Sequence, residues 1–376
     1  MSSTIHLVIA CGGTGGHFYP TLAIARAFQA SGGKVTLLIS GAHADEQLAL
    51  ARSNGVDALP SKAERLPSIR HPFQVLAFAF RFIRNVLYAR RQLKELKADI
   101  LLGMGSYASL PACIFKPSSL PLFLHEGNAF MGKANRILLR KATAIGLSLP
   151  LQYPEQLKGR TSAIVGMPLR EAVLKAAANL DEGQKEAEDY LLEAGLTPKK
   201  TTLLVFGGSQ GAQFINQLLE ETAPLLTGKE LQIIHLTGSQ ENDALIQTYA
   251  RAGIPACVRP SESHIEKCYL ASSLVICRGG ASTLCELALF SKPAIILPLP
   301  TAADDHQSCN ARLAESRSGA IHLPQAEATP QSLTAHLLPL LENPEKLTKM
   351  GNAIHSLAQP DAANNMVRLI MQSCKS

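Results

Sequence analysis

Residues 5–20 read IHLVIACGGTGGHFYP, an apolar run that leads directly into a glycine-rich loop and the start of a helix. Residues 202–212, TLLVFGGSQGA, repeat this order about half a chain later. Glycine leaves backbone N–H groups open to an anion, and a helix N-terminus adds partial positive charge. Two copies of the strand–loop–helix unit predict two nucleotide-fold halves with a ligand between them.

Outward from these loops, short apolar runs alternate with helical patterns along the chain. Such runs are typical of parallel strands buried on both faces, so the predicted fold class is α/β, doubly wound, twice over. A chain of 376 residues is also too long for one ordinary core. The predicted strands cover residues 5–10, 34–40, 99–103, 120–125 and 143–147 in the first half, and 202–206, 231–236, 273–277 and 293–298 in the second.

The junction between the halves is predicted at VGMPLR, residues 165–170, because a proline after a strand cannot continue the ladder and suits a hinge. The polar stretch 179–189 would separate the halves further. A first domain over 1–166 and a second over 167–359 follow. Helical periodicity near the C-terminus predicts a helix over about 360–376 that packs back on the first domain.

Composition narrows the function classes. The net charge of +6 fits a slightly basic surface or attraction to anionic lipid or phosphate. Nucleic acid is not an expected partner, because the sequence has no long basic run and no zinc-ligand spacing. Its eight cysteines include no CxxC pair, which indicates buried free thiols. No stretch of about 18 apolar residues predicts a helix that spans a membrane.

Polar residues follow three strands of the first half, where such folds bind ligands. GGTGGH differs from the GxGxxG dinucleotide pattern, which argues against a dehydrogenase. The loop alone would suit a tight turn without a ligand, but His17 at a helix start beside glycines suits a general base for a sugar hydroxyl. GMGSYAS at 103–109 and LHEGN at 124–128 mark the same rim of a predicted cleft.

In the second half, CRGGASTLCE at 277–286 forms a further phosphate-type loop. Its helix start would stabilise a diphosphate leaving group, and Glu286 would accept two ribose hydroxyls. A plain helix cap with a surface glutamate is the alternative. No DxD motif occurs, so helix dipoles, backbone and arginine would neutralise the diphosphate, with Arg170 and Ser209 available for it. AADDHQ at 302–307 offers further hydrogen-bonding groups for a sugar.

The segment Arg65–Arg91 places phenylalanine and aliphatic residues among arginines. An apolar helix with basic flanks suits contact with an anionic membrane surface. A core helix with solvated arginines is the alternative.

Taken in order, these blocks resemble the MurG family of bacterial peptidoglycan N-acetylglucosaminyltransferases over nearly the whole chain. The resemblance implies a GT-B fold, with two Rossmann-like domains facing across a cleft. It implies inverting transfer of GlcNAc from UDP-GlcNAc to the muramyl 4-hydroxyl of lipid I, giving lipid II, with no cofactor and no required metal. The implied location is the cytoplasmic face of the bacterial inner membrane, as a peripheral protein near a cell-wall synthesis or division complex.

The resemblance also implies residue roles. His17 is the candidate base, with Glu126 as its helper. Substrate contacts are expected from Thr14, Gly15, Gly16, Asn128, Arg170, Ser209, Glu262, Ala281, Ser282, Thr283, Leu284, Cys285, Glu286 and Gln307.

Two departures from the family pattern stand out. Gly127 replaces a glutamine of the HEQN block, which removes a side-chain role there. Ser261-Glu262 replaces the Phe-Ile pair that contacts uracil, so a backbone contact to the base would survive and an apolar wall would not. Another UDP-sugar enzyme on this fold, a glycolipid transferase or a UDP-GlcNAc 2-epimerase, is the alternative function. A non-catalytic nucleotide-sugar-binding or scaffold protein is the alternative outside enzymes.

Overall fold

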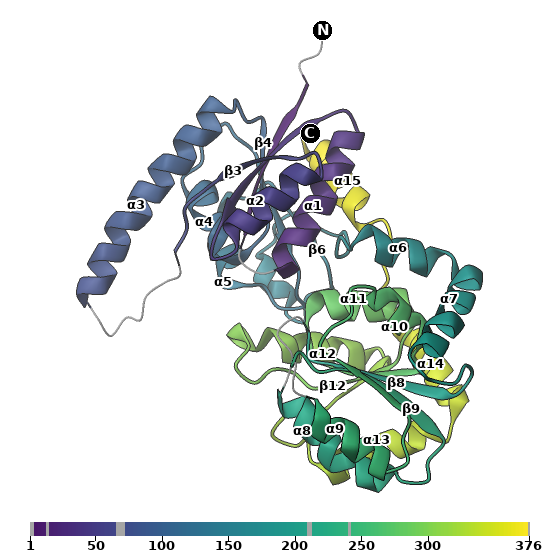
Figure 1. The fold of residues 1–376 in the computed structure, drawn as a ribbon. Helices are drawn as coiled ribbons and strands as arrows, with labels where there is room; N and C mark the ends of the chain where they lie inside the picture. The colour runs from purple at the N-terminus through teal and green to yellow at the C-terminus, as the bar shows by residue number, and fades with distance from the viewer. Residues whose placement is uncertain (1–3, 13–14, 65–71, 209–212, 240–241, 375–376) are drawn as a thin grey trace. The chain divides into compact units, whose positions relative to one another are not determined.

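A computed structural model describes residues 4–12, 15–64, 72–208, 213–239 and 242–374, and divides the chain into two compact units (Figure 1). The first unit joins Met1–Arg170 to Gln359–Ser376, and the second is Glu171–Ala358. The sequence predicts domain boundaries after residues 166 and 359.

The first unit contains one parallel sheet in the order β3-β2-β1-β4-β5-β6-β7. Its central strands are buried on both faces, as continuous apolar runs require. The strands are β1 His6–Gly12, β2 Lys34–Ser40, β3 Asp57–Pro60, β4 Ile100–Gly103, β5 Leu122–Glu126, β6 Ala144–Leu147 and β7 Ser162–Ile164.

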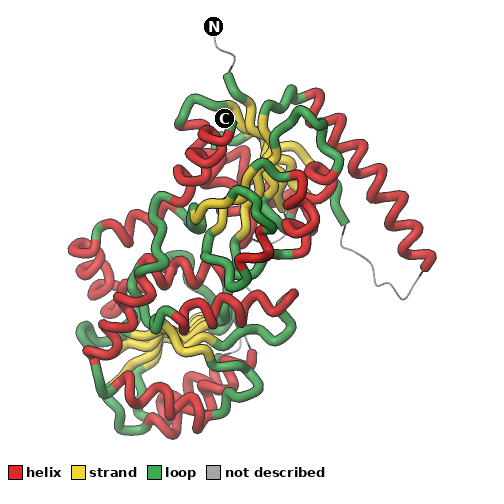
Figure 2. The backbone as a smooth tube through the Cα atoms, turned by 180° about the vertical axis from the view of Figure 1, so that it is seen from behind, coloured by secondary structure: helices red, strands yellow, loops and turns green. Residues whose placement is uncertain are grey.

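Helices cover both faces of this sheet (Figure 2). Leu7 and Ile9 of β1 belong to one core, whereas Val8 and Ala10 belong to the other, as the two-residue period of a strand dictates. The helices are α1 Gly15–Ala30, α2 Ala44–Ser53, α3 Pro72–Glu95, α4 Ser106–Ile114, α5 Lys133–Leu138 and α15 Ala362–Ser373, with 3₁₀ turns η1 Leu139–Lys141 and η2 Pro154–Leu157.

The C-terminal helix α15 completes the core of the first unit. Met366 and Ile370 are fully buried in the cluster that contains Leu7, Ile9 and Phe28. Gly146 on β6 has no room for a side chain, because a Cβ there would lie 2.6 Å from the Met366 sulfur. The sheet is therefore shaped to receive this helix.

The second unit has a parallel sheet in the order β10-β9-β8-β11-β12-β13. Its strands are β8 Thr201–Phe206, β9 Leu231–Leu236, β10 Ala256–Arg259, β11 Leu274–Cys277, β12 Ala294–Ile296 and β13 Ala320–His322. Its helices are α6 Glu171–Ala178, α7 Leu180–Glu193, α8 Gln213–Thr222, α9 Asp243–Arg251, α10 Ile265–Ala271, α11 Ala281–Leu289, α12 His306–Ser316, α13 Pro330–Leu341 and α14 Pro344–His355, with 3₁₀ turns η3 Ala223–Leu226 and η4 Ala303–Asp305.

One prediction about this unit is wrong. The polar stretch 179–189 is not a separator but belongs largely to helix α7, which packs against α10. Glu182, Lys185 and Asp189 are exposed, whereas Ala187, Tyr190 and Leu191 are buried. Among the described residues, no helix is long and apolar enough to cross a bilayer.

Candidate active site

His17 lies in the first turn of α1, beside the carboxyl ends of the adjacent strands β1 and β4. Its Nδ1 atom lies 3.0 Å from the backbone oxygen of Met104, just after β4. A carbonyl oxygen only accepts hydrogen bonds, so Nδ1 carries the proton and Nε2 is the basic nitrogen of the neutral ring. The contact fixes both the orientation and the tautomer that a general base needs.

Gly105 lies near both this imidazole and a second polar side chain. Its φ of 72° lies in the left-handed region, and its Cβ position would be 3.9 Å from His17 Cε1 and 3.4 Å from Asn135 Nδ2. Asn135 is buried on α5 and was not predicted, because nothing in its local sequence marks it. Its amide donates to the His125 carbonyl and to Glu126 Oε2, each at 2.9 Å.

Glu126, at the end of β5, is a buried residue whose carboxylate accepts several hydrogen bonds from the residues that follow it. The backbone N–H groups of Asn128 and Gly132 donate to it at 3.1 and 2.9 Å. The Asn128 and Asn135 amides add contacts at 3.4 and 2.9 Å. Such bonds satisfy the acceptor positions of a buried carboxyl group. Glu126 thus holds Asn128 in place, and Asn135 links it to the neighbourhood of Gly105 and His17.

His125 is a buried neighbour that the sequence did not single out as functional. Its Nε2 atom lies 3.0 Å from the Ser148 hydroxyl, and burial lowers its pKa to about 4. It is therefore neutral near pH 7. Its ring contacts Ser148 and the Gly166 carbonyl, which indicates a structural role that links β5 to the segments after β6 and β7.

The remaining predicted residues of the first unit stand at loop and helix ends. Gly15 and Gly16 are the first residues of α1, whose N-terminal N–H groups have no partner within the helix. Thr14 lies outside the described residues. Arg170 is exposed and is the last residue before the second unit.

In the second unit, β11 leads through Arg278, Gly279 and Gly280 into α11. Gly279 packs directly on α12, because a Cβ there would lie 2.4 Å from the Gln307 backbone oxygen. The Asn310 amide donates to the Gly279 carbonyl at 2.9 Å. This close approach fixes the loop that precedes the helix, and it explains why no larger residue stands there.

The predicted donor block occupies the start of α11. Ala281, Ser282 and Thr283 are half-buried in its first turn, whereas the Leu284 and Cys285 side chains lie in the core. Because these two side chains are buried, Leu284 and Cys285 could contact a ligand only through their backbone groups. Gln307 of α12 accepts a hydrogen bond from the Leu299 N–H at 2.9 Å through Oε1. Ser209 lies outside the described residues.

Arg278 was not predicted, although it stands inside the quoted loop. Its guanidinium is buried and donates to the Leu297 and Pro298 carbonyls at 3.0 and 3.1 Å. Arg278 thus links the carboxyl end of β11 to that of β12, and it adds a positive charge next to the Gly279–Gly280 loop.

Glu262 is engaged in a side-chain network after β10. Arg259 donates to its Oε2 atom at 3.0 Å, Tyr190 donates to the same atom at 3.2 Å, and the His264 N–H donates to Oε1 at 3.0 Å. The hydrogen bonds from these three residues and the Arg259 charge lower the pKa of Glu262 against the effect of burial. These donors engage the Glu262 carboxylate within its own loop. Only backbone groups of the loop would therefore contact a nucleobase.

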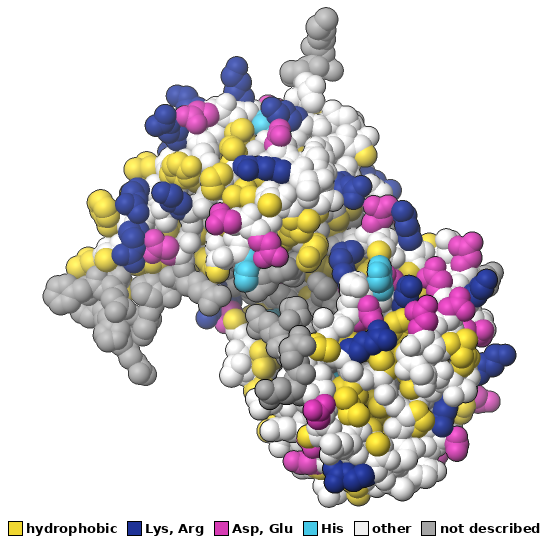
Figure 3. Space-filling view, viewed as in Figure 1, with side chains coloured by type: hydrophobic (Ala, Val, Ile, Leu, Met, Phe, Trp, Pro, Cys, Tyr) yellow, Lys and Arg dark blue, Asp and Glu magenta, His cyan; other side chains and the backbone are white. Residues whose placement is uncertain are grey.

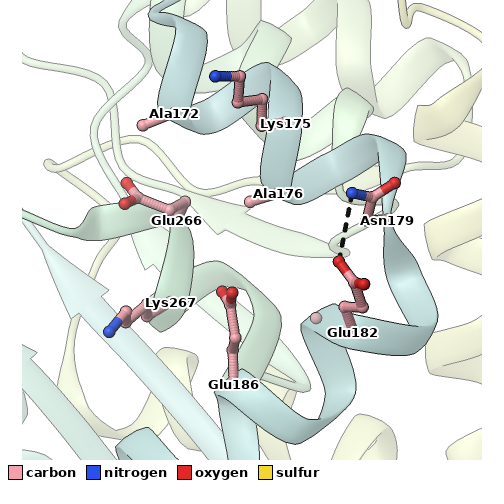
Figure 4. Close-up of a pocket in the computed structure, with 9 residues that line it drawn as sticks. Ala172, Lys175, Ala176, Asn179, Glu182, Glu186, Glu266 and Lys267 are labelled. Atoms are coloured by element: carbon pink, nitrogen blue, oxygen red, sulfur yellow. Dashed lines mark hydrogen bonds between the residues drawn. The ribbon is translucent and has the colours of Figure 1, made fainter.

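A cavity of about 260 Å³ lies elsewhere in this unit, between α6, α7 and α10 (Figure 4). Lys175, Glu186 and Glu266 are among the residues that line it. None of the predicted site residues belongs to its lining, so it is distinct from the strand-end loops.

Comparison with known proteins gives a consistent result. The glycosyltransferase family 28 N-terminal domain matches residues 7–147, and the C-terminal domain of the same family matches residues 202–366. UDP-N-acetylglucosamine–N-acetylmuramyl-(pentapeptide) pyrophosphoryl-undecaprenol N-acetylglucosamine transferases are similar over 98% of both chains, at 33% identity in Stutzerimonas stutzeri and 35% in Ectopseudomonas mendocina.

Solved structures agree. MurG of Acinetobacter baumannii superposes with a TM-score of 0.78 at 27% identity, covering 98% of this chain and 99% of its own. A UDP-GlcNAc 2-epimerase of Neisseria meningitidis, solved with UDP-GlcNAc, shares the fold at a TM-score of 0.67 and 12% identity, covering 98% of this chain and 100% of its own.

Proposed function

The chain belongs to the family 28 glycosyltransferases that are named N-acetylglucosamine transferases of pyrophosphoryl-undecaprenol, and we propose that it moves GlcNAc from UDP-GlcNAc to the 4-hydroxyl of MurNAc in lipid I. The product would be lipid II, with inversion at the sugar carbon. The two Rossmann-like units are those of a GT-B enzyme.

The observation that carries this proposal is the oriented imidazole of His17. With Nδ1 bonded to the Met104 carbonyl, Nε2 would take the proton of the acceptor hydroxyl. The acceptor oxygen would then bond to C1 of GlcNAc as the bond from C1 to the diphosphate oxygen breaks, and UDP would leave. Glu126 supports this step by holding Asn128 and, through Asn135, the surroundings of the imidazole.

The second unit would hold the donor. The first turn of α11 and the backbone of Gly279 and Gly280 would receive the diphosphate, where N–H groups and the helix dipole favour negative charge. Ser209 and Arg170 would add contacts to the phosphates. Glu286 would bind the ribose, the backbone at Glu262 the base, and Gln307 the sugar.

Helix α3 supports a location at a membrane surface. Leu76, Phe80, Ile83 and Leu87 repeat at helical spacing on one face and are 59–71% exposed. Exposed Arg84, Arg90 and Lys94 accompany them, and Figure 3 shows hydrophobic and basic side chains together on this side of the first unit.

Apolar side chains with basic neighbours favour an anionic bilayer surface, where the acceptor lipid resides. We therefore propose peripheral binding at the cytoplasmic face of the inner membrane, beside a cell-wall synthesis or division complex. The part of the predicted segment at 65–71 lies outside the described residues.

The test is an assay with labelled UDP-GlcNAc and a soluble lipid I analogue, with and without a chelator. The expected products are a lipid-linked disaccharide and UDP, at equal rates in both conditions. Release of free ManNAc would indicate an epimerase instead, and transfer to diacylglycerol a glycolipid transferase. No UDP release with the lipid I analogue would contradict the proposal.

A further inference from the structure

Tyr269 is a buried residue of α10 that the proposed mechanism does not use. Its ring stacks on Phe290 with a centroid distance of 5.3 Å and meets Phe206 edge-on at 6.1 Å. Phe206 ends β8, directly before the second glycine loop, and Phe290 follows α11. The ring is fully buried and therefore held between the two elements that carry the predicted donor loops.

The hydroxyl of this ring reaches the predicted ribose ligand. Tyr269 donates to Glu286 Oε2 at 2.9 Å. Glu286 itself is half-buried, one turn into α11. A carboxylate has about four acceptor positions, so a bond from Tyr269 is compatible with bonds from ribose hydroxyls on the same group.

Helix α10 is fixed at the same point by a second side chain. Lys292 donates to the carbonyl of Leu270 at 3.3 Å and to that of Ser272 at 2.6 Å. These carbonyls flank the end of the helix, immediately after Tyr269. The tyrosine hydroxyl is thus presented from a rigid element, with little freedom in either the ring or the helix.

We propose that Tyr269 is a positioning residue for ribose recognition, acting through Glu286. This inference rests on the proposed function, in which Glu286 binds the ribose. A glutamate side chain has three rotatable bonds, and one anchored oxygen removes most of that freedom before the nucleotide arrives. The hydroxyl would therefore raise affinity for the ribose without touching the substrate.

The experiment compares binding of UDP and 2′-deoxy-UDP to the wild type and to Tyr269→Phe, which keeps the ring and removes the hydroxyl. We expect UDP to bind about five- to twentyfold more weakly to the variant, because the freed Glu286 side chain must then be ordered when UDP binds. Binding of 2′-deoxy-UDP should change less, so the preference for UDP should shrink. The KM for UDP-GlcNAc should rise while kcat stays within about twofold, because the transfer step does not involve this contact.

Two controls separate the possible failures. Tyr249→Phe removes another buried hydroxyl of this unit, which contacts His235 at 2.9 Å, and should leave the preference for UDP unchanged. Glu286→Ala should abolish that preference, and adding Tyr269→Phe to it should have no further effect. If Glu286→Ala alone leaves the preference intact, the proposed ribose contact is wrong. If it abolishes the preference but Tyr269→Phe does not reduce it, only the role of Tyr269 is refuted.

Discussion

The two units carry parallel sheets with matching central strand orders, yet they hold their strand-end loops by different means. In the first unit, the buried Glu126 carboxylate gathers N–H donors from a loop, and a backbone carbonyl orients His17. In the second, Gly279 packs on α12 so closely that only a hydrogen atom fits. Side-chain control suits a group that must move a proton, and backbone control suits the binding of an anion.

Replacing His17 with alanine is the most severe test of this difference. Turnover should fall about 10²- to 10⁴-fold, the usual contribution of a general base. Affinity for UDP should stay within about twofold, because UDP is assigned to the other unit. Initial rates and UDP titrations would measure the two effects. Turnover close to that of the wild type would show that His17 is not the base. A parallel loss of UDP affinity would contradict the assignment of UDP binding to the second unit alone.

Acidification tests a feature that the units share. Burial lowers the pKa of His125 in the first unit to about 4 and that of His235 in the second to about 3. Unfolded histidine, with a pKa near 6.5, binds a proton that the folded state excludes. Both residues therefore stabilise the fold above about pH 6.5, and this stability is lost as the pH falls toward the folded pKa values. For His125 alone the loss amounts to about 3 kcal/mol.

Urea unfolding at pH 7.5, 5.5 and 4.5 would measure this loss, and hydrogen exchange would assign it to each unit. Replacing His235 with glutamine should reduce the pH dependence in the second unit and leave that of the first unit unchanged. Equal stability at pH 7.5 and 4.5 would contradict the buried neutral state of both rings.

The backbone control of the second unit can be tested by a pair of neighbouring glycines. Gly279→Ala places a Cβ 2.4 Å from the Gln307 backbone oxygen, so the loop must shift and UDP affinity should fall about tenfold. Gly280→Ala is the matched control, since the nearest atom to its Cβ is Thr283 Oγ1 at 3.5 Å. Isothermal titration with UDP would compare them, and wild-type affinity in both variants would refute the role assigned to the loop.

The smallest expected effect concerns the surface of the first unit. Phe80→Glu on α3 should weaken binding to vesicles with anionic phospholipid about five- to tenfold, because an apolar side chain at the bilayer boundary is lost. Leu192→Glu on α7 of the second unit removes a side chain that is 62% exposed and should have no effect in the same flotation assay. A similar loss in both variants would indicate non-specific adsorption.

The strands that the sequence predicts and those that it misses differ in position within the sheets. Every predicted strand exists, including Lys34–Ser40 and Leu231–Leu236 with unchanged bounds. The four missed strands, β3, β7, β10 and β13, are the outermost strands of the two sheets. They are short and partly exposed, so they lack the apolar run that marks a buried parallel strand.

The site shows a similar limit. His17, Glu126 and the glycine loops could be located because they follow strands directly in the sequence. Asn135 and Tyr269 could not be assigned a role, since each meets its partner only across the fold, on a helix whose local pattern is that of an ordinary core element. Arg278 stands within a recognised block, but its contacts with Leu297 and Pro298 depend on the adjacency of β11 and β12.

Helix α15 has a consequence for how the protein is made. The first unit begins to emerge from the ribosome before the second, but Met366 and Ile370 can reach its core only after the whole second unit has been synthesised. Until then, the surface around Phe28 and Gly146 that this helix covers stays open to water. The core of the unit that is translated first is therefore completed only after the second unit has been made, and a chain that stops before residue 362 would expose apolar surface to chaperones and proteases.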